Sequence, residues 1–279
     1  DPTFAGQIMR LTDPNLVQPW AHHFNVGASR QVTPTLAVDV DYVHSVGKDE
    51  IHRWPINRAE NLNTDLSPPG VFLPQFAEIR VEGNRGHSQF DGLYFTGRMR
   101  MSRAQLLTSY AWTESKNIAD DFGSNPSNLD NLHWEDDFGL APNDVTHRFT
   151  AGVVGSVWKN LHLSSAVQAN TGKPFEARIG AGGSRNRVRA IDPATGQPYP
   201  RNSFRAGGFF SWDIRVSYVA RLGANASIEP MFEIFNLTNH ANFDRDSYQT
   251  NVNAVDFGDA RAVLNNSQRQ AQFGVRVKF

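Results

Sequence analysis

Nine segments of this sequence alternate between apolar and polar residues, and the connections between them alternate between short and long. A period of two places successive side chains on opposite faces of a β-strand, so these segments predict a sheet with one apolar face. The predicted strands are 21–31, 35–46, 89–101, 104–114, 146–158, 161–172, 210–222, 226–237 and 270–279. In the last strand the pattern runs without a break to Phe279.

Tight turns join alternate strands. They are QVTP, MSR, Lys159-Asn160 and GAN, whereas the other connections are long and rich in Gly, Pro, Asn and Asp, at 48–88, 115–145, 173–208 and 239–267. Loops of about thirty residues are rare in compact soluble domains, but outer-membrane barrels have short periplasmic turns and long extracellular loops. The alternation therefore predicts an all-β, antiparallel transmembrane β-barrel in the bacterial outer membrane.

The two faces of the predicted strands differ in charge. Charged residues on the polar face should point into the lumen, because a charge at mid-membrane on the lipid face costs about 2–4 kcal/mol. These residues are Asp39, Asp41, Arg98, Arg215, Arg276 and Lys278. Four aromatic residues near strand ends on the apolar face fit a girdle at the membrane surface; in a soluble sandwich they would be core. They are Tyr110, Trp112, Trp212 and Tyr218.

The direction of the strands predicts that residues 1–279 are a C-terminal portion of a barrel. If the short turns are periplasmic, the ninth strand runs toward the periplasm, and so does the first, which then starts outside the cell. Bacterial single-chain barrels have an even number of strands. We therefore expect about 9–10 strands here and earlier strands upstream; the alternatives are a mis-assigned first strand or an extra pair within 48–88.

Composition excludes several classes of protein. The net charge of -1 argues against a nucleic-acid-binding protein. There is no cysteine to form a disulfide or a thiolate metal site, and no run of about 18 apolar residues that would predict a transmembrane helix. A mean hydropathy of -0.46 looks soluble, but a barrel confines its apolar residues to every second position and gives a similar average.

Several stretches resemble, in order, the C-terminal barrel of TonB-dependent outer-membrane receptors of the Oar-like group, whose members carry a carboxypeptidase-regulatory-like domain. These stretches are SQFDGLYFTGRMR, LLTSYAWTESKN, NDVTHRFTAGVV, RNSFRAGGFFSWDIRVSYVARL, MFEIFNLTNHANF and QFGVRVKF. The resemblance implies a barrel of about 22 strands with a plugged lumen, energised through TonB to import a scarce solute. No plug domain or TonB box is recognisable within 1–279, so both are expected upstream.

The resemblance also implies a role for the last residues. The terminal aromatic residue and the alternate apolar residues before it are similar to the signal that the outer-membrane assembly machinery reads. In this sequence they are Phe273, Val275, Val277 and Phe279.

Motifs for catalysis or cofactor binding are weak, and we expect a protein that is not an enzyme and holds no cofactor. GAGGSR at 180–185 lacks the last Gly of a dinucleotide loop, and in NTGKPF Pro174 stands where a P-loop needs Ser or Thr. The nine histidines form no HExxH motif. Acidic residues at Asp120-Asp121 and Glu135-Asp136-Asp137 are calcium ligands by type, but solvated loop charge is the favoured interpretation.

Arginines concentrate in the 173–208 loop. The guanidinium group suits phosphate and carboxylate, so this loop is a candidate contact for lipopolysaccharide or an anionic solute. The arginines are Arg178, Arg185, Arg187, Arg189, Arg201 and Arg205. The alternative is a solvated loop whose charge is partly balanced by Glu176 and Asp192.

Three functions remain open from the sequence. The leading hypothesis is a partial receptor barrel that supplies wall and loops for solute import, with a plug, the TonB complex and the outer-membrane lipid as partners. The second is a passive outer-membrane pore or surface adhesin. The third is a soluble all-β carbohydrate-binding domain, whose apolar faces would meet across a core.

Overall fold

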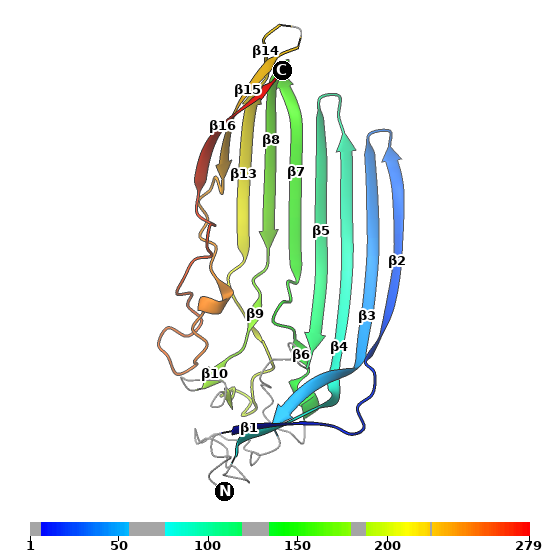
Figure 1. Cartoon of the computed structure of the whole chain (residues 1–279), viewed down its shortest axis with the longest axis vertical. Helices are drawn as coiled ribbons and strands as arrows, with labels where there is room; N and C mark the ends of the chain where they lie inside the picture. The colour runs from blue at the N-terminus through cyan, green and yellow to red at the C-terminus, as the bar shows by residue number, and fades with distance from the viewer. Residues whose placement is uncertain (1–6, 56–75, 119–133, 180–187, 224) are drawn as a thin grey trace.

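The computed structural model describes residues 7–55, 76–118, 134–179, 188–223 and 225–279. Within them the chain forms one twelve-stranded sheet and two small two-stranded sheets. The long strands lie side by side along the longest axis of the molecule, with the C-terminus at the end that carries the tight turns (Figure 1). We call this end the turn end and the opposite end the loop end.

Nine strands of nine residues or more form the wall. In sheet order they are β2 (Trp20–Thr33), β3 (Leu36–Pro55), β4 (Phe76–Arg100), β5 (Ala104–Asn117), β7 (His147–Trp158), β8 (Leu161–Asn170), β13 (Phe209–Tyr218), β15 (Ser227–Phe235) and β16 (Gln270–Lys278). Each is antiparallel to its neighbours in this order. The nine predicted strands and the alternation of short and long connections are therefore confirmed.

Short elements decorate the wall. The remaining strands are β1 (Gln7–Thr12), β6 (Gly139–Leu140), β9 (Pro174–Phe175), β10 (Arg178–Ile179), β11 (Val188–Arg189), β12 (Phe204–Arg205) and β14 (Ala220–Arg221). Two 3-10 helices, η2 (Trp134–Asp137) and η4 (Arg245–Ser247), are the helical elements of the described residues. No helix in the described ranges has the length and apolar character needed to cross a membrane.

Strand register joins the apolar residues of all nine strands into one continuous face. Val40 lies opposite Phe95, Phe95 opposite Tyr110, and Tyr110 opposite Phe149. Farther along the sheet Trp212 lies opposite Val167, and Phe232 opposite Phe273. Among the described residues, no second layer packs against this wide hydrophobic face. An apolar face that protein leaves uncovered is expected of a barrel wall in contact with lipid.

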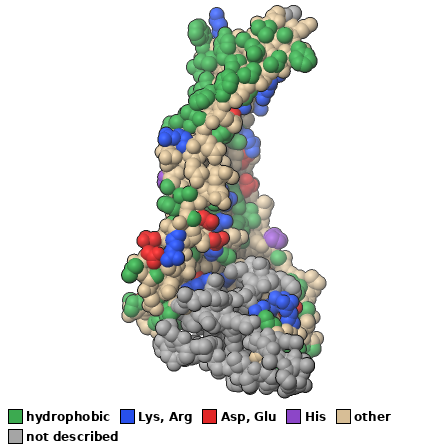
Figure 2. Space-filling view, turned by 60° about the vertical axis from the view of Figure 1, so that its left-hand side comes forward, with side chains coloured by type: hydrophobic (Ala, Val, Ile, Leu, Met, Phe, Trp, Pro, Cys, Tyr) green, Lys and Arg blue, Asp and Glu red, His purple; other side chains and the backbone are tan. Residues whose placement is uncertain are grey.

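The opposite face is polar, and its charges pair across strands. Arg98 lies 3.3 Å from Asp39, Arg215 lies 3.5 Å from Glu233, and Arg276 donates a hydrogen bond of 3.1 Å to Glu229. The six charged residues predicted for this face all belong to its register. Figure 2 shows hydrophobic side chains gathered near the turn end, with acidic side chains farther toward the loop end.

The sequence prediction for 48–88 is wrong in part. The strands flanking this segment extend well into it, since β3 continues to Pro55 and β4 begins at Phe76; residues 56–75 lie outside the described ones. In this extension both faces carry polar residues, as in VEGNRGH, so the period-two pattern is hidden. The ninth strand ends at Lys278 rather than at the last residue.

β1 is a second departure from the prediction, which had neither this strand nor any parallel pair. It pairs in parallel with the outer part of β4, from Gln7 opposite Phe76 to Thr12 opposite Glu82. β1 lies at the loop end, far from the turns (Figure 1). The N-terminal described segment is thereby fastened to the loop end of the wall.

An aromatic cluster organises the loops. Phe175 is buried, with ring centroids 5.9 Å from Phe204, 5.5 Å from Tyr248 and 6.4 Å from Phe257. Phe204 in turn lies 5.1 Å from Tyr199. These rings come from two different long connections, so burying them holds those connections together at the loop end.

Candidate functional site

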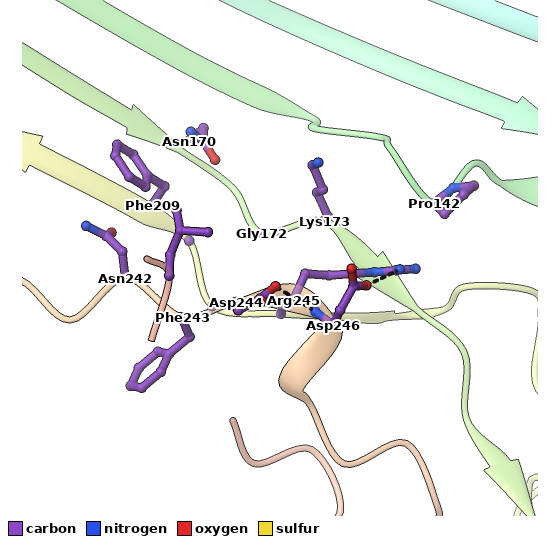
Figure 3. A pocket seen from close by; sticks show the side chains of 14 residues that line it. Pro142, Asn170, Gly172, Lys173, Phe209, Asn242, Phe243, Asp244, Arg245 and Asp246 are labelled. Carbon is purple, nitrogen blue, oxygen red and sulfur yellow. Dashed lines mark hydrogen bonds and ion pairs between the residues drawn. The ribbon is translucent and has the colours of Figure 1, made fainter. Parts of the chain in front are cut away.

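A cavity of about 320 Å³ lies where β8 and β13 meet the connection between β15 and β16. We call it the loop-base cavity; Figure 3 shows its lining. Its walls come from the end of β8, the segment between β12 and β13, and the first part of the last connection. The polar and aromatic residues that line it include Asn170, Lys173, Phe209, Asn242, Asp244 and Arg245.

Two glycines allow the backbone segments of this cavity to approach closely. A Cβ on Gly172 would lie 1.8 Å from the carbonyl oxygen of Ala206, and a Cβ on Gly208 would lie 2.6 Å from that of Asn170. No side chain fits at such distances, so glycine is required at both positions. The contact brings the strand end of β8 against the start of β13.

Asn242 fastens the last connection to the wall. Its Nδ2 donates to the carbonyl oxygen of Phe210 at 2.9 Å, and its Oδ1 accepts from the backbone N–H of Phe210 at 2.8 Å. The side chain therefore takes the place of a neighbouring strand, and it is buried, with 2% of its surface exposed. A buried amide with both ends bonded is well suited to fix one geometry.

Charged groups lie on one side of the loop-base cavity. Asp244 caps η4 by accepting from the N–H of Asp246 at 3.0 Å. Arg245 donates from Nε to the carbonyl oxygen of Pro174 at 3.0 Å and from Nη1 to Asp246 at 2.8 Å. Lys173 is exposed and makes no ion pair with any described residue, and in Figure 3 it points away from Arg245.

A second cavity, of about 390 Å³, adjoins the first on the polar face of the sheet. The two share Phe209, Asn242 and Leu264. We call the second one the amide pocket, because side-chain amides dominate its lining: Gln168, Asn236, Asn265, Asn266, Gln268 and Gln270, in addition to Asn242. The last connection thus folds back over the polar face and encloses space against it.

The predicted arginine loop is described only in part. Arg185 and Arg187 lie outside the described residues, as does the side chain of Arg189, whose backbone forms β11. Arg178 donates to Glu176 at 3.1 Å. The described residues therefore do not test whether these arginines form one surface, and anion contact by this loop stays a prediction.

Arg201 and Arg205 hold the loops to one another. Arg201 is buried and donates to the side-chain oxygen of Asn117 at 2.8 Å, and burial lowers its pKa to about 10. Arg205 donates to the carboxylate of Asp144 at 2.6 Å, to the hydroxyl of Thr146 at 2.7 Å and to the carbonyl oxygen of Gly172 at 3.0 Å. Arg201 thereby joins the 173–208 loop to the end of β5, and Arg205 joins it to the β5–β7 connection and to the segment after β8.

The other motifs are described only in part. Asp120, Asp121 and GAGGSR lie outside the described residues, and Pro174 of NTGKPF begins the short strand β9. Glu135 is exposed whereas Asp137 is buried. Among the described residues, no three His, Asp or Glu side chains are grouped so that they could hold a metal ion.

Three residues of the predicted assembly signal, Phe273, Val275 and Val277, lie on the apolar face of the edge strand β16, and Phe279 directly follows that strand. Phe273 is 70% exposed and Phe279 is fully exposed. Val275 and Val277 lie opposite Pro230 and Ile228 of β15. Within the described residues β16 pairs with β15 alone, so its other edge is open.

Residues 1–195 match a family described as an outer membrane beta barrel domain. The chain belongs to this family. Its apolar face is therefore the lipid-facing wall in the outer membrane, and its polar face lines the lumen. No curated protein matches the chain.

Solved structures share the fold of this barrel domain at low sequence identity. The outer membrane transporter YddB from Escherichia coli is 12% identical with a TM-score of 0.62, and 99% of this chain covers 34% of it. The iron transporter FrpB from Neisseria meningitidis is 14% identical with a TM-score of 0.57, and 98% of this chain covers 33% of it. A copper transporter, OprC, is 12% identical with a TM-score of 0.51, and 95% of this chain covers 33% of it.

This barrel domain thus spans about a third of the length of the structures it matches. These structures share the fold of its barrel wall. The tight turns and the C-terminus lie at the periplasmic end, and the loop-base cavity and amide pocket lie toward the outside of the cell.

Proposed function

We propose that this barrel domain is the C-terminal portion of a TonB-dependent outer-membrane receptor that captures a solute outside the cell and imports it. The observation that carries the proposal is the pair of cavities built where the extracellular loops fold back onto the luminal wall. A passive pore needs no cavities enclosed between its loops and its wall. The named functions of the structures with the same fold, which include iron and copper transport, support it by analogy.

The wall requires completion by further strands. Within the described residues β2 pairs only with β3, and β16 only with β15, so two open edges face the bilayer. Open edges do not occur in the hydrocarbon region, because unpaired backbone groups cost several kcal/mol each. We propose that strands upstream in the gene close the barrel onto β16, and that a plug domain fills the lumen and connects it to the TonB complex.

The polar face provides a surface for such a plug. Its ion pairs between strands, such as Arg276 with Glu229, balance several of the charges within the wall. A plug can then slide or reorganise without leaving buried unpaired charges, whose cost would oppose movement. Transport in this proposal involves no bond chemistry by the barrel domain, and no enzyme activity is assigned to it.

A pair of strains tests the proposal. One lacks the gene for this protein, and the other lacks TonB but retains the gene. A transport receptor predicts loss of energy-dependent uptake of the same solute in both strains, with restoration by the respective gene. If uptake depends on this gene but not on TonB, the protein is a passive pore; if neither deletion changes uptake but surface attachment falls, it is an adhesin.

A further inference from the structure

The lining of the amide pocket is almost free of ionisable residues, although the pocket lies on the charged face of the sheet. Of its described lining residues Asp213 alone is ionisable. By contrast, the adjoining loop-base cavity is lined by four charged residues, Lys173, Asp244, Arg245 and Asp246. The two cavities therefore suit different chemistry even though they share a wall.

The frame of the amide pocket is internally bonded. Asp213 Oδ1 accepts from the hydroxyl of Ser211 at 2.7 Å and from the N–H of Asn236 at 2.9 Å. Asn236 is 3% exposed and donates from Nδ2 to the carbonyl oxygens of His240 and Ser267, at 2.9 Å and 2.7 Å. These contacts leave the position of the last connection well defined before any ligand enters.

By contrast, other side-chain amides at the surface of the pocket have no hydrogen-bond partner among the described residues. In the described part of the chain, five exposed amide side chains of the lining make no hydrogen bond. They are Gln168, Asn265, Asn266, Gln268 and Gln270. Each offers two N–H donors and one carbonyl acceptor. Two rings, Phe209 and Phe235, add partly exposed apolar surface beside them.

This combination selects for one class of ligand. A hydroxyl group both donates and accepts a hydrogen bond, so a row of hydroxyls matches a row of amides. An anionic ligand would lose its hydration without gaining a counter-charge, and a cationic ligand would find only Asp213, whose Oδ1 already accepts two hydrogen bonds. An apolar ligand would desolvate the amides without bonding them. A sugar ring presents hydroxyls at its edge and C–H groups on its face, and the latter can lie on the two phenylalanine rings.

A neutral peptide fits the pocket less well. Peptide backbones bind best along an open strand edge, whereas β8 and β13 are paired on both edges here. The open edge of β16 is the one that the proposed upstream strands would close. The recognition groups are side-chain amides instead. The volume of about 390 Å³ is within the range of small-ligand sites.

We propose that the amide pocket binds a neutral, polyhydroxylated solute, an uncharged oligosaccharide, on the luminal side of the extracellular loops. The proposal rests on the proposed transport function, since it names the class of solute that the receptor takes up. It assigns recognition to the amides of β8, β16 and the last connection.

Direct binding tests this inference. The complete gene product that carries these residues, purified from the outer membrane in detergent, is applied to an array of neutral glycans, anionic glycans and uncharged peptides. We expect neutral glycans to be retained and the other two groups not. Binding to anionic glycans or peptides alone, or to no glycan at all, would overturn the assignment.

Variants link the binding to the pocket. The double substitution Gln168→Leu with Gln270→Leu should weaken the affinity for the best neutral glycan about thirtyfold, since each lost neutral hydrogen bond contributes about 1 kcal/mol. Gln105→Leu is the matched control. Gln105 is an exposed glutamine of β5 that lies on the same polar face of the sheet but outside the pocket. Equal affinity in the double variant and the control would contradict the proposal.

A single substitution of similar size distinguishes a loss of binding from a folding defect. Gln168→Glu keeps the size of the side chain but places a second carboxylate in the pocket, and it should weaken neutral-glycan binding about fivefold while heat-modifiable migration stays normal. The outcome also separates the two proposals. If the TonB-dependent uptake phenotype persists but no neutral glycan binds, this inference fails alone; if glycans bind but uptake ignores TonB, the transport proposal fails alone.

Discussion

Asp144 and Arg205 form a charged hydrogen bond of 2.6 Å that joins two extracellular connections. The Asp144 side chain is completely buried, whereas that of Arg205 is 30% exposed. Asp144 also accepts from the backbone N–H of Ser115 and from the hydroxyl of Thr146. The pair therefore connects the end of β5, the start of β7 and β12.

Replacing Asp144 with Ala should destabilise the loop end strongly. Arg205 would lose its counter-charge and the N–H of Ser115 its acceptor, which together cost about 2–3 kcal/mol in the free energy of unfolding. Urea unfolding of the purified gene product in detergent measures the change. Asp246→Ala is the matched control, because its pair with Arg245 is exposed and should contribute less than about 1 kcal/mol. Equal effects from the two variants would refute the assigned role of Asp144.

Neighbouring residues on β4 test which face meets lipid. Phe95 lies on the apolar face, opposite Val40 and Tyr110, whereas Thr96 lies on the polar face opposite Asp39. Phe95→Arg should destabilise the membrane-inserted barrel by about 2–4 kcal/mol. Thr96→Arg should be tolerated, since it places the charge in the lumen near a carboxylate. The amount of folded protein recovered from outer membranes measures both effects. A larger loss with Thr96→Arg than with Phe95→Arg would mean that the polar face, not the apolar face, meets lipid.

Phe279 tests the assembly signal. The side chain is fully exposed, so its removal costs no packing within the described residues. If the assembly machinery buries this ring, Phe279→Ala should lose about 2 kcal/mol of recognition and slow insertion into the outer membrane roughly thirtyfold. Lys278→Ala, which alters the opposite face, serves as the control. Pulse-labelled cells give the insertion rate, and unchanged kinetics for Phe279→Ala would remove this residue from the signal.

A loop carboxylate predicts a pH dependence. A hydrogen bond from Arg261 lowers the pKa of Asp256, which accepts at 2.7 Å. A carboxyl group with a lower pKa in the folded loop stabilises that loop above the ordinary carboxyl pKa of about 4, and the contribution is lost as pH falls through the lowered value. Hydrogen exchange of residues 254–262, corrected for intrinsic rates, should therefore rise at pH 3 relative to pH 7.

The variant Asp256→Asn provides the comparison for that experiment. It removes the titrating group, so its exchange at pH 7 should already resemble that of the parent protein at pH 3 and should change little with pH. An identical pH response in the parent and the variant would show that another group controls this loop.

The wall was predictable from the sequence because its determinants are local. Each strand in the membrane has one apolar and one polar face, and short turns such as Lys159-Asn160 mark where strands end; Lys159 indeed has a positive φ of 30°. The outer parts of β3 and β4 were missed because, beyond the membrane, neither face must be apolar. β1 was missed because a six-residue strand has little local signal and depends on a distant partner.

The candidate site was not predictable in the same way. Asn170, Phe209 and Asn242 line one cavity although they lie far apart in the sequence, and only the order of the strands brings them together. FNLTNHANF does carry a local signal, since Asn236 and Asn239 adopt the positive φ that asparagine tolerates. That signal indicates a turn, however, and does not reveal that Asn242 replaces a strand partner beside Phe210.

The parallel pairing of β1 with β4 sets an order of events during biogenesis. β1 precedes β2 in the chain, but its partner segment, Phe76 to Glu82, is translated only after β2 and β3. Closing such a long loop has an entropic cost that local hairpins avoid. The hairpins of the wall can therefore form first, and the extracellular rim is completed late. Evolution can then remodel the extracellular rim while the steps that insert the wall stay the same.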